Sequence, residues 1–172
     1  VSIDPELGAI FYIFDIPQPG TRPVAERSRR CMNCHSDEDT LQVPGIVIKS
    51  VIPGPTGGSL ESYRRGLSGH EIPLPDRFGG WHVTGAEGIG PHWGNLTGRF
   101  TPQGIATTPL PPGERFNWSI FPVATSDLLA HLLHEHQAGF VNRVVESHYR
   151  LRTALARGKG KLLDADRADM ER

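Results

Sequence analysis

Apolar residues in the C-terminal third of the chain recur at spacings of three and four positions, as they do on one face of an α-helix. The pattern runs from Ser126, a suitable N-cap with Asp127 in the first turn, to a stop signal at Gly158. It predicts one long helix over residues 126–157, with His136 in the middle of its apolar stripe. The members of this stripe are Leu128, Leu129, Leu132, Leu133, His136, Phe140, Val144 and Leu151.

The N-terminal third predicts shorter elements. Residues 24–35 favour a short helix, and the β-branched run in residues 41–52 favours a short strand pair. Residues 1–23 are punctuated by proline. We expect them to form an arm that wraps the domain and docks through its aromatic side chains, Phe11, Tyr12 and Phe14.

The middle of the chain is dense in glycine and proline. Residues 44–113 hold 15 of the 20 glycines and 10 of the 15 prolines, a composition that excludes a run of regular helices. We therefore expect residues 53–113 to be loop. A loop of that length in a compact domain normally either binds something or is disordered, and the aromatic residues in it argue against disorder. The fold class that follows is mainly α with extensive irregular loops. It forms one domain over residues 1–158, followed by a charged tail over residues 159–172 that can lead into a longer chain.

Charge and hydropathy exclude two classes of interaction. The 172 residues carry 18 basic and 19 acidic side chains, and the resulting net charge of −1 provides no field to hold nucleic acid or an anionic membrane. The longest apolar run, Gly8–Phe14, is far shorter than the roughly 17 residues that span a bilayer. We expect no nucleic-acid partner and no direct membrane span.

Both cysteines lie in one pentapeptide, CMNCH, which runs from Cys31 to His35. The pattern C-x-x-C-H is typical of covalent attachment of a c-type haem. Two thiols one helical turn apart can each add to one vinyl group of a porphyrin, and the next histidine then faces the iron as proximal ligand. A disulfide or a redox-active C-x-x-C leaves His35 unexplained. A zinc site would have to recruit His134 and His136 from the distant helix. The motif therefore predicts one haem c, bound through Cys31 and Cys34.

The sixth ligand of the iron is expected to be a second histidine. Both methionines are poorly placed, because Met32 lies inside the attachment motif and Met170 lies in the charged tail. His92 is the leading candidate and His70 the second, since both lie where small residues let the backbone approach a ring closely. His136 follows, with a core role as its alternative. Two further histidines are weaker candidates, His82 and His148.

A haem also needs apolar walls and cations for its two propionates. Trp81 and Trp93 lie in the glycine-rich region and suit the walls of a flat macrocycle. Arg77 and Arg99 flank these tryptophans, and the planar fork of arginine matches a carboxylate. We name both arginines as propionate partners, with an ordinary surface role as the alternative.

Several further motifs follow the attachment segment in a fixed order. The longest is RFGGWHVTG over residues 77–85, and the shorter ones are VPG at 43–45, GH at 69–70, PHWGN at 91–95 and EHQ at 135–137. Together they resemble a family of largely uncharacterised bacterial monohaem c-type cytochromes, whose hallmark is RWGGWYVTG downstream of a single C-x-x-C-H. The resemblance implies one covalent haem, export from the cytoplasm and a role in respiration or redox chemistry. By residue match it singles out His35, His70, His92 and His136.

These features predict an electron-transfer protein rather than a catalyst. An iron with histidine on both faces changes its ligation little between Fe(III) and Fe(II), and its potential is lower than with methionine. We expect a periplasmic or other extracytoplasmic location, with redox proteins or a membrane-bound electron-transfer complex as partners. One alternative is a haem enzyme or gas sensor with an open sixth site. Another is a structural haem subunit that docks through the 126–157 helix, with His131 and His134 on its outer side.

Overall fold

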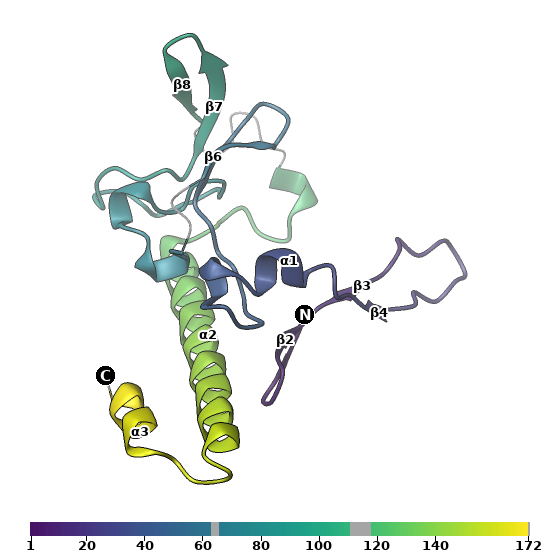
Figure 1. Cartoon of the computed structure of the whole chain (residues 1–172). Coiled ribbons are helices and arrows are strands. Elements are labelled where there is room, and N and C mark those ends of the chain that lie inside the picture. Colours follow the sequence, from purple (N-terminus) through teal and green to yellow (C-terminus); the bar gives the residue numbers. More distant parts are fainter. Residues whose placement is uncertain (63–65, 111–117, 172) are drawn as a thin grey trace. The chain divides into compact units, whose positions relative to one another are not determined.

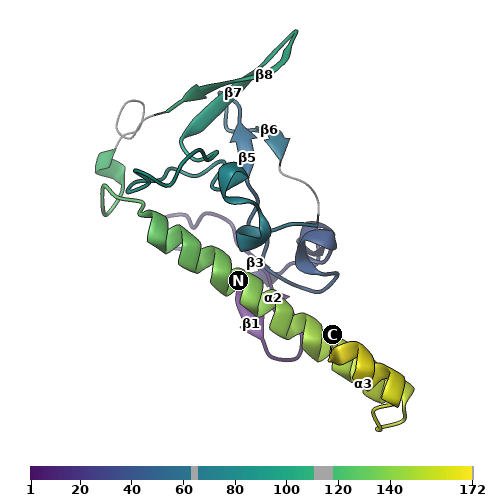
Figure 2. The same cartoon turned by 90° about the vertical axis from the view of Figure 1, so that its left-hand side faces the viewer.

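The computed structural model describes residues 1–62, 66–110 and 118–171. The chain divides into two compact units, and the elements of each are labelled in Figure 1 and Figure 2. The first unit combines Val1–Val47 with Phe140–Arg172, and the second is Ile48–Gly139. Within the described ranges, no helix has the length and apolar character needed to cross a membrane.

Short elements make up the first unit. Strand β1 (Ser2–Asp4) pairs with β2 (Gly8–Ile10), and β3 (Tyr12–Ile13) pairs with β4 (Glu26–Arg27), both antiparallel. The helical elements are α1 (Met32–His35), the 3-10 turn η1 (Glu38–Thr40), the C-terminal part of α2 (Leu128–Arg157) and α3 (Asp164–Met170). Of the aromatic residues expected to dock the N-terminal arm, one is buried, Phe11, and two are exposed, Tyr12 and Phe14.

Two hairpins and a small apolar cluster organise the second unit. Strand β5 (Val51–Pro53) pairs with β6 (Ser59–Ser62), and β7 (Leu96–Thr101) pairs with β8 (Gly104–Pro109). Three 3-10 turns connect the rest: η2 (Gly69–Glu71), η3 (Leu74–Asp76) and η4 (Trp118–Ile120). The core cluster consists of Phe78, Val83 and Leu128, with Ala86, Ile89 and Leu132 packed against it.

The expectation of a mainly α fold is wrong. The described residues contain three α-helices and four two-stranded antiparallel sheets, a mixture of α and β. The region expected to be loop holds β6 and the β7–β8 hairpin, in which β-branched residues flank a reversal at Gly104 with φ +118°. The attachment helix expected over residues 24–35 shrinks to α1, because residues 26–27 form β4. Only the end of the 41–52 segment is a strand, and it pairs with β6.

Helix α2 lies where the sequence predicts it, but the face expected to be buried is exposed. The helix begins at Leu128 and is capped by Asp127 rather than Ser126, since Asp127 Oδ1 accepts a hydrogen bond from the Leu129 N–H at 2.8 Å. Leu129 and Phe140 are each 62% exposed, and Leu133 and Val144 are about half exposed. The buried face is centred on Glu135, Ala138, Asn142 and Val145.

This exchange of faces has a physical cause. The segments that cover α2 are irregular, so their backbone N–H and C=O groups need partners that a regular strand or helix would supply itself. Polar side chains of α2 provide such partners, and small residues allow the backbone to come close. A hydrophobic stripe could do neither.

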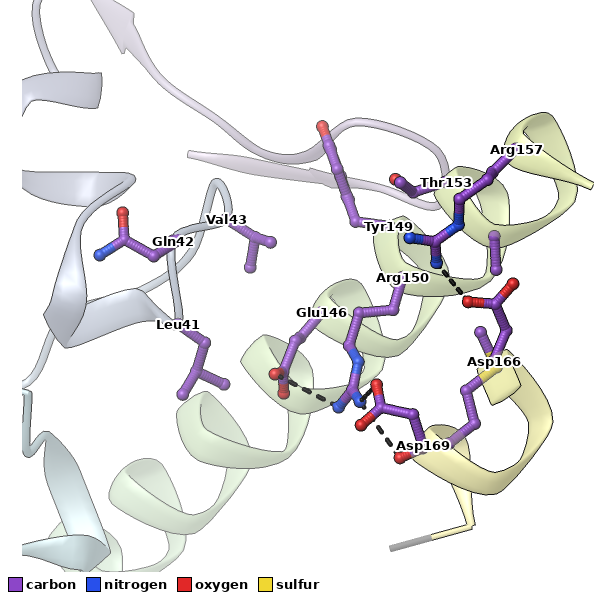
Figure 3. A pocket seen from close by; sticks show the side chains of 12 residues that line it. Leu41, Gln42, Val43, Glu146, Tyr149, Arg150, Thr153, Arg157, Asp166 and Asp169 are labelled. Atoms are coloured by element: carbon purple, nitrogen blue, oxygen red, sulfur yellow. Dashed lines mark hydrogen bonds and ion pairs between the residues drawn. The ribbon is translucent and has the colours of Figure 1, made fainter. Parts of the chain in front are cut away.

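The charged tail forms a helix, α3, which lies against the C-terminal part of α2 (Figure 3). Asp166 pairs with Arg157, and Asp169 Oδ2 lies 2.6 Å from Nη2 of Arg150. Both arginines are well exposed, so each pair contributes at most about 1 kcal/mol to stability. Beside these pairs lies a cavity of about 320 Å³ whose lining includes Met170, which is half-buried rather than unpacked.

Candidate functional site

The pentapeptide with both cysteines forms a single helical turn. The carbonyl of Cys31 accepts hydrogen bonds from the N–H of Cys34 at 3.2 Å and of His35 at 3.0 Å. Cys31 is half-buried, Cys34 is exposed, and neither is in a disulfide. The turn therefore presents two reduced thiols and an imidazole from one short piece of backbone.

A backbone carbonyl holds the imidazole of His35. Nδ1 of His35 lies 3.1 Å from the Gly45 carbonyl oxygen, and the Gly45 N–H donates back to the His35 carbonyl at 2.9 Å. When Nδ1–H donates to that carbonyl, the lone pair is on Nε2, which is the tautomer that binds a metal. The ring of buried Phe11 lies 4.2 Å from the His35 ring, centroid to centroid, and restricts its rotation.

Asn142 of α2 fixes the loop that carries this carbonyl. Its Oδ1 accepts from the Ile46 N–H at 2.8 Å, and its Nδ2 donates to the Ile46 carbonyl at 2.8 Å. Gly45 has to be glycine here, because a Cβ would lie 2.6 Å from Asn142 Oδ1 and 2.9 Å from Thr40 Cβ. Asn142 could not be predicted from the sequence, because its position on α2 is opposite the expected core face.

The residues of this turn fit a covalent haem. Free thiols are the groups that react with the vinyl groups of a porphyrin, and a porphyrin supplies four ligands itself, so the protein has to add only axial ones. No cluster of three or more His, Cys, Asp or Glu side chains arranged for a metal ion occurs in the described part of the chain. A cavity of about 450 Å³ lies beside the turn, with Phe11, Arg29 and Met32 in its wall.

The second unit brings two of the predicted ligand histidines together. His70, in η2, has its ring 5.6 Å from that of His136, centroid to centroid, and its Nδ1 lies 3.4 Å from the Glu135 carbonyl oxygen. The His70 ring rests on Gly139, where a Cβ would come within 2.4 Å of Cε1. Both histidines are exposed.

His92 has a different environment. Its half-buried ring makes an edge contact with Phe78 at 5.9 Å between centroids. Its Nδ1 is buried and has no hydrogen-bond partner among the described residues. His35 belongs to the first unit, whereas His70, His92 and His136 belong to the second. Ligation by a histidine on each face of the iron therefore stays a prediction.

The predicted propionate partners also differ from each other. Arg77 is largely buried: its Nε donates to the Ile72 carbonyl at 2.8 Å, its Nη2 donates to the His70 carbonyl at 2.7 Å, and its Nη1 lies 3.5 Å from Glu135 Oε2. These bonds tie the backbone of η2 to α2. Arg99 is exposed on β7. A propionate role for either arginine stays a prediction.

The RFGGWHVTG segment builds structure around the predicted haem walls. Phe78 is 1% exposed and adopts φ +67°, and a Cβ on Gly79 would come within 2.4 Å of the Val51 carbonyl oxygen. Trp81 is 39% exposed, and its ring makes T-shaped contacts with His131 and His134 of α2. Trp93 is half-buried. The glycines of this motif thus allow the turn that follows Phe78 to pack directly against β5.

Glu135 is a buried carboxyl that sequence reasoning missed. It is 4% exposed, and burial raises its pKa from 4.5 to about 7 even though the Arg77 guanidinium lowers it. In the sequence, only its place next to His136 in the EHQ motif distinguishes Glu135 from other acidic residues of the helix.

Replacing Asn142 by alanine should lower the free energy of unfolding by about 2 kcal/mol. The change leaves the half-buried N–H and C=O of Ile46 without their partner. Urea denaturation measures the loss, and Gln137→Ala, on an exposed position of the same helix, should stay within about 0.5 kcal/mol of wild type. Equal losses of unfolding free energy in the two variants would contradict a stabilising role for the bonds between Asn142 and Ile46.

The raised pKa of Glu135 makes stability depend on pH. Between pH 4.5 and about pH 7 the folded protein retains a proton that the unfolded chain has released, so folding becomes less favourable as pH rises. Relative to Glu135→Gln, wild type should lose up to about 3 kcal/mol between about pH 5 and about pH 8. Urea denaturation over that range tests this, and a constant difference between the two proteins would refute it.

Comparisons with known proteins give no family for this chain. No protein-family model matches it, and no curated protein and no solved structure is similar to it. The resemblance to bacterial c-type cytochromes therefore rests on the sequence motifs alone.

Proposed function

We propose that this protein is a c-type cytochrome that carries one haem, bound covalently through Cys31 and Cys34, and transfers single electrons. The observation that carries the proposal is the turn from Cys31 to His35, with His35 Nδ1 held by the Gly45 carbonyl. Cys31 and Cys34 would hold the haem through two thioether bonds, each made by addition of a thiol S–H across one vinyl double bond, which needs no oxidant and no leaving group.

Residues of this chain would hold the haem and orient the His35 imidazole. When bound, the haem supplies an iron that accepts or gives one electron at a time. His35 would offer Nε2 as an axial ligand, and a hydrogen bond from Nδ1–H to the Gly45 carbonyl would make the imidazole a stronger donor. Phe11 prevents the ring from turning. Because the ligand is oriented before any electron arrives, little has to rearrange when the charge changes.

A second histidine is proposed for the sixth position, because Met32 lies inside the attachment motif and Met170 lines the cavity beside α3 rather than the one beside the turn from Cys31 to His35. His92 leads on sequence grounds, but ring environments favour His70. Histidines that bind metals usually donate their other ring N–H to a carbonyl or carboxylate, and His70 Nδ1 has such a carbonyl at 3.4 Å, whereas His92 Nδ1 has no partner among the described residues. The partners proposed are redox proteins or a membrane-bound electron-transfer complex outside the cytoplasm.

Covalent attachment is tested by producing the protein in bacterial cells that export it and attach haem c. Wild type should keep its haem through denaturing electrophoresis and show the added mass by mass spectrometry. Cys31→Ala and Cys34→Ala should each lose one thioether bond, and the double variant should lose the haem. The control, Asn33→Ala, lies between the cysteines on an exposed position and should retain it. A wild-type protein without covalent haem would refute the proposal.

Axial ligation is tested by absorption spectroscopy of the oxidised and reduced protein. A bis-histidine iron is low-spin, lacks the weak long-wavelength band given by methionine, and does not bind CO rapidly. His70→Ala should open the iron to CO, whereas His92→Ala and His136→Ala should leave a six-coordinate spectrum. Opening by His92→Ala alone would restore the leading sequence candidate. Rapid CO binding by wild type would indicate an open-site enzyme or sensor instead.

A further inference from the structure

The hairpin of β7 and β8 leaves one strand edge open in the second unit (Figure 1). β7 packs against β5 and β6, and a Cβ at its Gly98 would lie 2.6 Å from Cγ2 of Ile52. β8 pairs with β7 along one side, and no strand of the described residues pairs with its other side. Strand β8 therefore presents a row of backbone N–H and C=O groups to solvent.

The register of the hairpin fixes which of these groups point outward. The Leu110 N–H donates to the Asn95 carbonyl at 2.7 Å, in line with the register of the two strands. Hydrogen-bonded and non-hydrogen-bonded pairs alternate along an antiparallel ladder, so every second residue of β8 bonds to β7. The residues between them point their backbone groups outward, and these are Ile105, Thr107 and Pro109. A proline, which has no N–H to donate, fits an outward position.

The composition of β8 does not protect this edge. Natural edge strands usually carry a charged side chain, a bulge or an internal proline that discourages pairing with another chain. β8 reads GIATTP, with no charged residue and with its proline at the last position. Its register with β7 continues without a shift over six residues, unlike that of β5 with β6. An extended peptide can add to such an edge as a further strand.

An arginine lies one strand away from the open edge. Arg99 of β7 is directly opposite Ala106 of β8, so both side chains lie on the same face of the hairpin. Arg99 is exposed and makes no hydrogen bond or ion pair with any described residue. Together with Thr97 and Thr108 it lines a cavity of about 470 Å³. Its guanidinium group is therefore available to a ligand.

The small side chain of Ala106 leaves room above β8 for Arg99 to reach an added strand. Neighbouring strands lie about 5 Å apart, so an added strand would lie about 10 Å from β7. The long side chains of an arginine and a glutamate can meet across this distance when only a methyl group lies between them. Because β8 itself contributes no charge, the cation of Arg99 selects a carboxylate on the added strand.

We propose that the open edge of β8 binds an extended peptide segment of a partner protein, with an acidic residue of that segment paired with Arg99. The peptide backbone bonds to Ile105 and Thr107, which provides affinity, and a carboxylate opposite Ala106 provides selectivity. Arg99, predicted from the sequence as a propionate partner, binds a carboxylate of different origin in this proposal. The site lies within the second unit and is independent of haem attachment, which the cysteine variants test separately.

Nuclear magnetic resonance titration of the full-length protein with two peptides tests the proposal. The probes are Ac-TVTEVTV-NH2 and Ac-TVTQVTV-NH2, which differ only in the charge of the central residue. At low ionic strength the glutamate peptide should bind roughly two- to fivefold more tightly. The preference should vanish at about 1 M salt, where the screening length is about 3 Å.

Matched variants assign the preference to one side chain. Arg99→Gln should bring the glutamate peptide down to the affinity of the glutamine peptide and leave the glutamine peptide unchanged, which also shows that the edge is intact. Arg22→Gln, at an exposed position in the first unit, should keep the preference.

Amide hydrogen exchange in the wild-type protein locates the bound strand. Without peptide, the N–H groups of Ile105 and Thr107 should exchange rapidly with solvent, whereas those of Ala106 and Thr108 should exchange slowly. Either peptide should slow the exchange of Ile105 and Thr107. Thr107→Pro, which removes one outward N–H, should weaken the binding of both peptides equally.

Several outcomes would overturn the proposal. Absence of binding by either peptide, equal affinities in wild type, a preference that survives Arg99→Gln, or unchanged exchange of Ile105 and Thr107 would each do so. Protection of these two N–H groups that rises with protein concentration in the absence of peptide would assign the edge to a second copy of this chain and would overturn the proposal as well.

Discussion

An irregular backbone has to find hydrogen-bond partners outside itself, and two asparagines meet this need at the places where the chain positions its chemistry. Asn142 binds both the N–H and the C=O of Ile46. Asn95 does the same to Val83, with both bonds at 2.7 Å. Each side chain imitates one step of a β-ladder for a loop residue that has no neighbouring strand. The Gly45 carbonyl, and through it the His35 ring, depends on the first clamp. The turn that leads to Thr84 and the start of α2 depends on the second.

Glycines provide the close approaches that this packing of irregular backbone also requires. Gly45 lets Asn142 reach the loop, Gly79 lets the core turn lie on β5, and Gly139 lets the His70 ring rest on α2. At each of these positions a Cβ would collide with a carbonyl, an amide or an imidazole. The glycine content of the middle of the chain is therefore a packing requirement at these positions, and only in part a sign of turns.

The sequence predicts structure where a local rule decides the outcome, and it does not where a tertiary contact decides. The length of α2 follows from the spacing of its apolar residues and a terminal glycine, whereas only the turn Met32–His35 forms from the helix expected over residues 24–35. The buried face of α2 could not be deduced from the sequence. Leu129 and Phe140 fit the pattern of a core face but are exposed, whereas Glu135 and Asn142 are polar but buried. Polar residues occupy the buried face of α2 because the backbone that covers this face is irregular and needs hydrogen-bond partners. The hairpins were missed for a related reason: glycine and proline mark reversals, and the strands beside them are too short for a clear alternating pattern.

These contacts change how the haem should be regarded. A chain with 37% hydrophobic residues suggests that the cofactor itself provides the core. Yet His35 is oriented by Gly45 and Phe11, and the loop behind it is held by Asn142, all through bonds that involve no porphyrin. A ligand fixed by the polypeptide pays its ordering entropy during folding rather than during attachment. If the proposed haem is bound, such a ligand would also keep its orientation when the charge on the iron changes, which is the property that rapid one-electron transfer requires. The polar clamps thus connect the unusual composition of the chain to its proposed chemistry.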